Sequence, residues 1–179
     1  MDKKTRWDIS ASTFGFAFIL LITVIAVFRL IAWQELTSPI GLLMEGVNSI
    51  HVPLDQLNQG QLTIFLIAFA TKTIAAITIC VTLMLATRGF LASDFFIAKN
   101  VRYFKIASWA ALAYIGGQFF EGMGNNWVSA TQGVDNNTLP NGIDDPGFIP
   151  MYILMMVLSM MAVALTRAVK LQEDQEGLI

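Results

Sequence analysis

The chain has 179 residues, of which 55% are hydrophobic and only 13% are charged, and its formal net charge is -2. This composition excludes an ordinary soluble globular domain, and the length excludes a large transporter. The concentrated basic face that binds nucleic acid is also missing from the sequence. We therefore expect one small membrane-embedded domain with no nucleic-acid partner.

Four apolar stretches are each long enough to cross a hydrocarbon layer of about 30 Å as a helix. They cover residues 14–33, 62–87, 103–120 and 148–166. Because a backbone in lipid must satisfy its own hydrogen bonds, and because these stretches exceed the length of barrel strands, we expect an all-α fold. The sequence predicts a single integral membrane bundle of four transmembrane helices over residues 1–179, with outer loops at 34–61 and 121–147.

The basic residues are distributed unevenly between the loops. Nine of the eleven lie in the N-terminus, the second loop and the C-terminus: Lys3, Lys4, Arg6, Arg88, Lys99, Arg102, Lys105, Arg167 and Lys170. The positive-inside rule makes that side the cytoplasm, so both termini are predicted to be cytoplasmic. We expect a multi-pass protein of a plasma membrane, whose inner basic residues meet anionic lipids at the cytoplasmic face.

Arg29 lies one turn inside the outer end of the first predicted span. One interpretation is a cation whose long side chain reaches back to the membrane interface. The other is a salt bridge with Glu121 or Glu35, which would clamp the outer ends of two spans together. The salt bridge would stabilise the fold and would not catalyse. Arg29 is also, with Lys72 and Glu121, a candidate contact to a partner subunit or a lipid.

Small residues recur at spacings of three and four in the second and third spans. They are Ala68, Thr71, Ala75, Thr78 and Thr82 in the second span, and Ala110, Ala113 and Gly117 in the third. Such spacing places them on one face of each helix, where small side chains let two backbones approach closely. We call these eight residues the small-residue seam, and we expect it to join the two spans.

Lys72 is the most unusual residue of the sequence, because it lies about eleven residues, or about 16 Å of helix, beyond Gln61. A cation near the middle of a membrane is costly and indicates a partner or a function. Glu121 is the nearest acidic candidate, but it lies near the outer end of its predicted span, so pairing would require the lysine to reach upward. A hydroxyl-solvated lysine, a contact with a lipid or a partner subunit, and ion or proton transport stay open.

The inventory of reactive side chains argues against catalysis. His51 is the only histidine and Cys80 the only cysteine, so neither paired haem ligands nor a zinc cluster can be assembled within the chain. No nucleophile triad, phosphate-binding loop or dinucleotide fingerprint is present. We expect no enzyme activity, no cofactor and no metal site.

Two stretches carry a resemblance to a known family. The first is Arg88-Gly89-Phe90 followed by Phe95, Asn100, Arg102 and Ile106, and the second is the acidic tail 168–179. Both are similar to patterns in a bacterial four-span membrane family that is catalogued only as a domain of unknown function, the tail being typical of actinobacterial members. The resemblance implies a bacterial plasma-membrane protein, sometimes encoded near a helix-turn-helix regulator, and no catalytic residues.

Three classes of function remain open. The first is a non-catalytic accessory or structural subunit of a larger bacterial membrane complex, for example a respiratory (cytochrome bc–oxidase) supercomplex, with other integral membrane subunits as partners. The second is a stand-alone regulatory or immunity-type membrane protein that acts through its basic inner loop. The third is a small transporter or ion-conducting oligomer that uses Lys72. We favour the accessory subunit.

Overall fold

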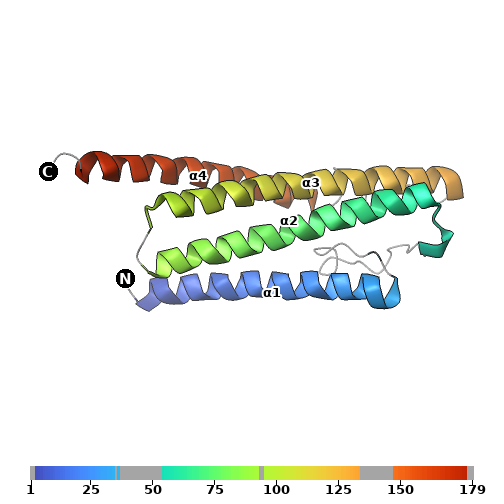
Figure 1. Cartoon of the computed structure of the whole chain (residues 1–179), viewed down its shortest axis with the longest axis horizontal. Coiled ribbons are helices and arrows are strands. Elements are labelled where there is room, and N and C mark those ends of the chain that lie inside the picture. Colours follow the sequence, from blue (N-terminus) through green and yellow to red (C-terminus); the bar gives the residue numbers. More distant parts are fainter. Residues whose placement is uncertain (1–2, 35, 37–53, 93–94, 134–146, 177–179) are drawn as a thin grey trace.

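The computed structural model of the chain describes residues 3–34, 36, 54–92, 95–133 and 147–176. Within these ranges the chain is all-helical, as predicted. The elements are α1 (Lys3–Trp33), a 3-10 turn η2 (Leu54–Gln56), α2 (Gln59–Leu91), α3 (Ala98–Gln132) and α4 (Phe148–Glu176). Successive α-helices run antiparallel, so that both ends of the chain and the α2–α3 connection lie at one end of the molecule (Figure 1).

Every α-helix is longer than the apolar stretch that predicts it, and the predicted boundaries need correction. The outer loop expected at 121–147 is wrong in its first part, because α3 continues to Gln132. The outer loop expected at 34–61 already contains η2 and the start of α2. The remaining parts of these loops, 37–53 and 134–146, lie outside the described residues. Hydropathy marks the length that suits a membrane, whereas caps and turn residues decide where a helix ends.

The ends of α2 and α3 that lie side by side have recognisable caps. Asn58 accepts a hydrogen bond from the backbone N–H of Gln61, and the Gln61 side chain accepts one from the backbone N–H of Asn58. This reciprocal capping box begins α2. At the other helix, Gly133 adopts a left-handed conformation with φ 66° and donates its N–H to the carbonyl of Ser129. Glycine takes that conformation without steric cost, so α3 ends there.

The helices form an open row in the order α1, α2, α3, α4. The most extensive interface joins α2 to α3, while α4 packs on α3 and α1 packs on α2. Among the described residues, no other pair of helices shares an extensive interface. Figure 1 looks down the shortest axis of the molecule and shows α1, α2 and α3 side by side, with the start of α4 overlapping α3 in this view. The sequence predicts a bundle of four helices but not their lateral order, which the structure gives as a row.

Three of the described helices are long and apolar enough to cross a membrane, over Arg6–Trp33, Gln59–Leu91 and Phe148–Gln175. The helix α3, which contains the predicted span 103–120, is long but more polar. Its position accounts for the difference. Because α3 lies between α2 and α4, many of its polar side chains are buried against protein and do not face the surroundings.

The interior is built largely from small side chains. Alanines make up much of the buried cluster shared by α2, α3 and α4, including Ala75, Ala76, Ala107 and Ala111, and larger side chains such as Phe104 complete it. Small residues let helix backbones approach closely, which is the main source of packing contact where the surroundings are apolar. The interface between α1 and α2 adds a hydroxyl contact of 3.1 Å between Thr13 and Thr87.

Candidate functional site

An ion pair between Lys72 and Glu121 joins α2 to α3. The Nζ atom of Lys72 donates to Oε2 of Glu121. The lysine side chain is 1% exposed and the glutamate side chain 28% exposed, so the pair is open to its surroundings only on the carboxylate side. Moving two charges into an apolar region is expensive, and their attraction offsets that cost only when the geometry is good. The pair is therefore the principal candidate site of the chain.

The length of α3 is what makes this pairing direct. The sequence places Glu121 at the outer end of a span, but in the structure the helix continues for another eleven residues to Gln132. Glu121 therefore lies inside the helix, one turn from Gly117, which packs against Lys72. The lysine meets the carboxylate across the interface and does not need to reach the end of its helix.

The close approach of the two helices at this site depends on Gly117. A β-carbon at Gly117 would lie 2.6 Å from Cγ of Lys72 and 3.2 Å from the backbone oxygen of Ala68. The missing side chain thus leaves room for the stem of the lysine. On the other side, Nζ of Lys72 lies 5.8 Å from the ring centroid of Tyr114, within the range of a cation–π interaction. Tyr114 is itself 1% exposed.

Similar contacts repeat along the whole α2–α3 interface and fix one antiparallel register. A β-carbon would come within 3.0 Å of the facing side chain at each of three further glycines. The facing pairs are Gly60 with Trp127, Gly124 with Phe65, and Gly89 with Asn100. Each glycine accepts a larger side chain from the opposite helix, so a shift by one residue would replace these contacts with clashes.

Hydrogen bonds close the outer end of this interface. Gln61, 2% exposed, donates from Nε2 to the Thr131 hydroxyl at 2.8 Å. Gln132 donates from Nε2 to the backbone oxygen of Gln56 at 3.0 Å. Because Gln61 also belongs to the capping box, one side chain both starts α2 and ties it to α3.

The small-residue seam is found in part. Ala68, Ala75, Thr82, Ala110 and Gly117 are buried, while Thr71 and Thr78 are partly exposed. Ala113 is exposed, so its assignment to the seam is wrong. The threonine hydroxyls of Thr78 and Thr82 bond to backbone oxygens of their own helix, and not across the interface. The seam therefore contributes to the α2–α3 interface through the small size of its side chains.

Arg29 does not join the ion pair. Its guanidinium carbon lies 5.7 Å from the ring centroid of Trp33, one turn further along α1. Among the described residues, the only ion pair of Glu121 is the one with Lys72, so the proposed clamp between Arg29 and Glu121 is not formed. The alternative partner, Glu35, lies outside the described residues. The contact with Trp33 fits the interpretation of an interfacial cation.

Sequence reasoning overlooked several buried polar residues of α3. Gln118 and Asn125 are buried at 3% and 8% exposure, and with Tyr114 and Glu121 they recur at spacings of four, three and four. This spacing is typical of one helix face. This spacing can be read from the sequence. A span that ends at Phe120, however, contains only Tyr114 and Gln118 and leaves Glu121 and Asn125 in the predicted loop.

The chemistry that these residues can perform is binding and charge compensation. Among the described residues, no group of three or more His, Cys, Asp or Glu side chains is placed to hold a metal ion. The Lys72–Glu121 pair can fasten two helices, and each group compensates the charge of the other. Comparison with known proteins finds no matching protein family, no similar curated protein and no similar solved structure.

Proposed function

We propose that the chain is a bacterial plasma-membrane protein that crosses the membrane four times, with α3 as the additional span. The support comes from the packing order. Since α3 lies between α2 and α4 and packs on both, a membrane crossed by those two helices also contains α3. The stripe of polar residues on α3 is largely buried in the protein, which lowers its cost in lipid.

The distribution of charge supports a cytoplasmic location for both termini. Figure 1 shows the ends of the chain and the α2–α3 connection at the same end of the row. The described basic residues outside the apolar core belong to these segments: Lys3, Lys4, Arg6, Arg88, Lys99, Arg102, Lys105, Arg167 and Lys170. A cytoplasmic basic end follows the positive-inside rule, and it would contact anionic lipid headgroups.

On this placement the ion pair lies in the outer part of the membrane. The helix α2 is about 50 Å long, whereas the hydrocarbon layer needs only about 30 Å. Figure 1 shows α2 and α3 extending beyond the end of α1 at Trp33 and beyond the start of α4 at Phe148. The end of α1 lies further out than the start of α4, and we take the end of α1 as the outer boundary, which leaves Lys72 nearer the surface than a count from Gln61 suggests.

For the role of the protein, we infer a non-catalytic accessory subunit of a larger membrane complex, such as a respiratory supercomplex. The open row of helices carries this inference. Among the described residues, α1 and α4 each share an extensive interface with one neighbour, and both edges of the row present large apolar side chains outward. Phe18 and Phe28 on α1, and Met156 and Met160 on α4, are between 46% and 70% exposed. Two free edges suit a subunit that other helices flank.

A gentle-detergent pull-down of the tagged chain from its native membrane tests this role, with mass spectrometry and a visible spectrum of the eluate. We expect stoichiometric membrane partners, and haem absorption if the complex is respiratory. Ser159→Trp on the exposed face of α4 and Ala17→Trp on the exposed face of α1 add bulk at each edge without adding charge. If a partner is lost with only one of the two variants, the helix that carries this substitution is the one that contacts the partner. A homo-oligomer without partners would overturn the role.

The ion pair favours a second candidate, a small transporter or ion-conducting oligomer. A lysine that is 1% exposed and paired with a partly exposed carboxylate can change partners during a transport cycle. If this candidate is right, Lys72→Met should abolish the flux of the transported ion or solute in proteoliposomes, although the variant protein is still purified in folded form. The reversed pair Lys72→Glu/Glu121→Lys controls for the loss of the bridge itself. A flux that survives Lys72→Met would reject this candidate.

A further inference from the structure

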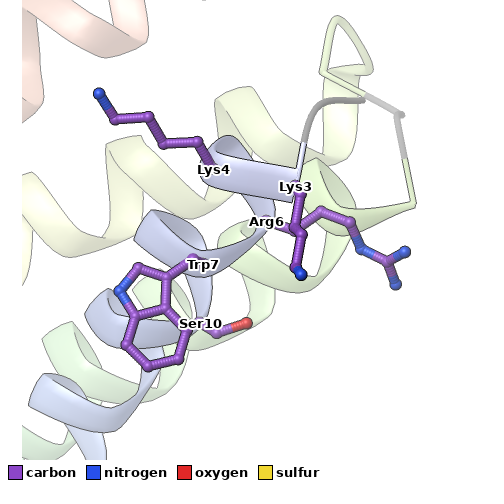
Figure 2. Close-up of a pocket in the computed structure, with 5 residues that line it drawn as sticks. All are labelled: Lys3, Lys4, Arg6, Trp7 and Ser10. Atoms are coloured by element: carbon purple, nitrogen blue, oxygen red, sulfur yellow. The ribbon is translucent and has the colours of Figure 1, made fainter.

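The first two turns of α1 surround a shallow hollow with basic and amphipathic side chains. Figure 2 shows Lys3, Lys4, Arg6, Trp7 and Ser10 spreading outward from these turns. All five residues are exposed, and the Trp7 side chain is exposed by 75%. Three cations at the end of one helix, with an indole ring beside them, form a surface that attracts anions and also has an apolar part.

The same face of α1 changes from basic to apolar along the helix. Lys3, Arg6, Trp7 and Ser10 follow the spacing of one helix face, and Phe14 and Leu21 continue it at intervals of seven residues. Phe14 is 76% exposed and Leu21 is 55% exposed. Along this face of α1, the basic side chains therefore come first, the ring of Trp7 comes next, and the apolar side chains of Phe14 and Leu21 follow.

This face lies on the free side of α1. The residues of α1 that are buried, Ile22, Thr23 and Ala26, lie on the other side of the helix, which packs on α2. Asp8 is the one acidic residue among the described residues of the first three turns, so the three cations are only partly balanced. The surface is open to a ligand that is anionic at one end and apolar at the other.

We propose that this face of α1 binds one anionic phospholipid of the cytoplasmic leaflet. The phosphate oxygens are held by Lys3 and by Arg6, whose guanidinium group can make paired hydrogen bonds. Lys4 points to the other side of the helix (Figure 2) and adds positive charge at the same end. Trp7 lies at the level of the glycerol backbone, and the acyl chains follow Phe14 and Leu21. The shared chemistry is a phosphate group, and the apolar continuation favours a lipid over free phosphate. This proposal requires the membrane placement but not the role as an accessory subunit.

Quenching of Trp7 fluorescence tests the proposal directly. Trp33, Trp109 and Trp127 are replaced by Phe, and the single-Trp protein is placed in vesicles with brominated phosphatidylglycerol or brominated phosphatidylcholine. We expect the anionic lipid to occupy the site preferentially, by roughly tenfold or more, because each cation near the lipid contributes about fivefold in affinity. Lys3→Gln/Lys4→Gln/Arg6→Gln should remove this preference.

A matched control separates a site from general attraction. Lys99→Gln/Arg102→Gln/Lys105→Gln removes the same number of charges from the same end of the molecule, and should keep the preference within about twofold. The single variant Arg6→Gln keeps Lys3 and Lys4, which preserve the orientation of the protein in the membrane. It should lower the preference for the anionic lipid about fivefold. Equal losses in both triple variants would overturn the proposal, as would competition by millimolar inorganic phosphate or the absence of any preference in the starting protein.

Discussion

Gly117 and Lys72 lie so close that a β-carbon on the glycine would come within 2.6 Å of Cγ of the lysine. The neighbouring Gly116 has nothing within 4 Å of the same position. Two adjacent glycines therefore differ completely in what surrounds them. This difference provides a matched test of how tightly α2 and α3 are held together.

Gly117→Ala should destabilise the protein by about 1 to 3 kcal/mol, because the added methyl group meets both the lysine stem and the backbone oxygen of Ala68. Gly116→Ala should be neutral or stabilising by up to about 1 kcal/mol, since alanine favours a helix over glycine. Steric trapping in bicelles gives the free energies of unfolding. Equal effects of the two substitutions would show that the close approach at Gly117 is unimportant.

Lys72→Met should lower the free energy of unfolding by about 3 kcal/mol, because it leaves the Glu121 carboxylate in an apolar region without its partner. This is the lower end of the range for a broken buried pair, since Glu121 keeps 28% exposure. Glu121→Gln should also destabilise. The double variant should cost less than the two single variants together, and strictly additive values would contradict a direct pair.

Asn58→Ala should cost about 1 kcal/mol through the loss of the capping box at the start of α2. The effect should be local, with faster hydrogen exchange at the first amides of α2 and little change in the middle of the helix. Gln59→Ala is the control, because Gln59 is exposed and its side chain takes no part in the cap. Faster exchange in the control as well would point to general fraying of the helix end.

Cysteine labelling should reveal the orientation of the chain. In a Cys80→Ala background, Ala98→Cys and Gln132→Cys place exposed thiols at the two ends of α3. An impermeant maleimide added to intact cells with a permeabilised outer layer should label the cysteine at Gln132 only. Both should react after lysis. Labelling of the cysteine at Ala98 in intact cells would reverse the proposed topology.

Much of the helical arrangement follows from the sequence, because long apolar runs and small-residue spacing act locally. The all-α fold and the packing of the second predicted span on the third are examples. The lateral order of the helices could not be predicted in this way. Hydropathy reports whether a face is apolar, but it does not report whether protein or lipid covers that face.

The end of α3 shows where local reasoning failed. Residues 122–126 read Gly-Met-Gly-Asn-Asn, which is turn chemistry when considered alone. In the structure these residues are helical, because Gly124 accepts the ring of Phe65 and Asn125 is buried. Contacts between helices override the weak helix propensity of glycine and asparagine here. The signal that could have corrected this is the continued spacing from Gln118 to Asn125.

The uneven lengths of the helices have a mechanical consequence. Beyond the level at which α4 begins, α1 continues alongside α2 while α4 no longer covers α3, and the last part of α2 and α3 extends past α1 as well (Figure 1). Two contacts join the helices along this stretch, the hydrogen bond from Gln61 to Thr131 near the outer end and the ion pair of Lys72 with Glu121 further in. The ion pair between Lys72 and Glu121 resists sliding of α2 along α3, so the outer ends of the two helices move together with the part of the helices around the ion pair.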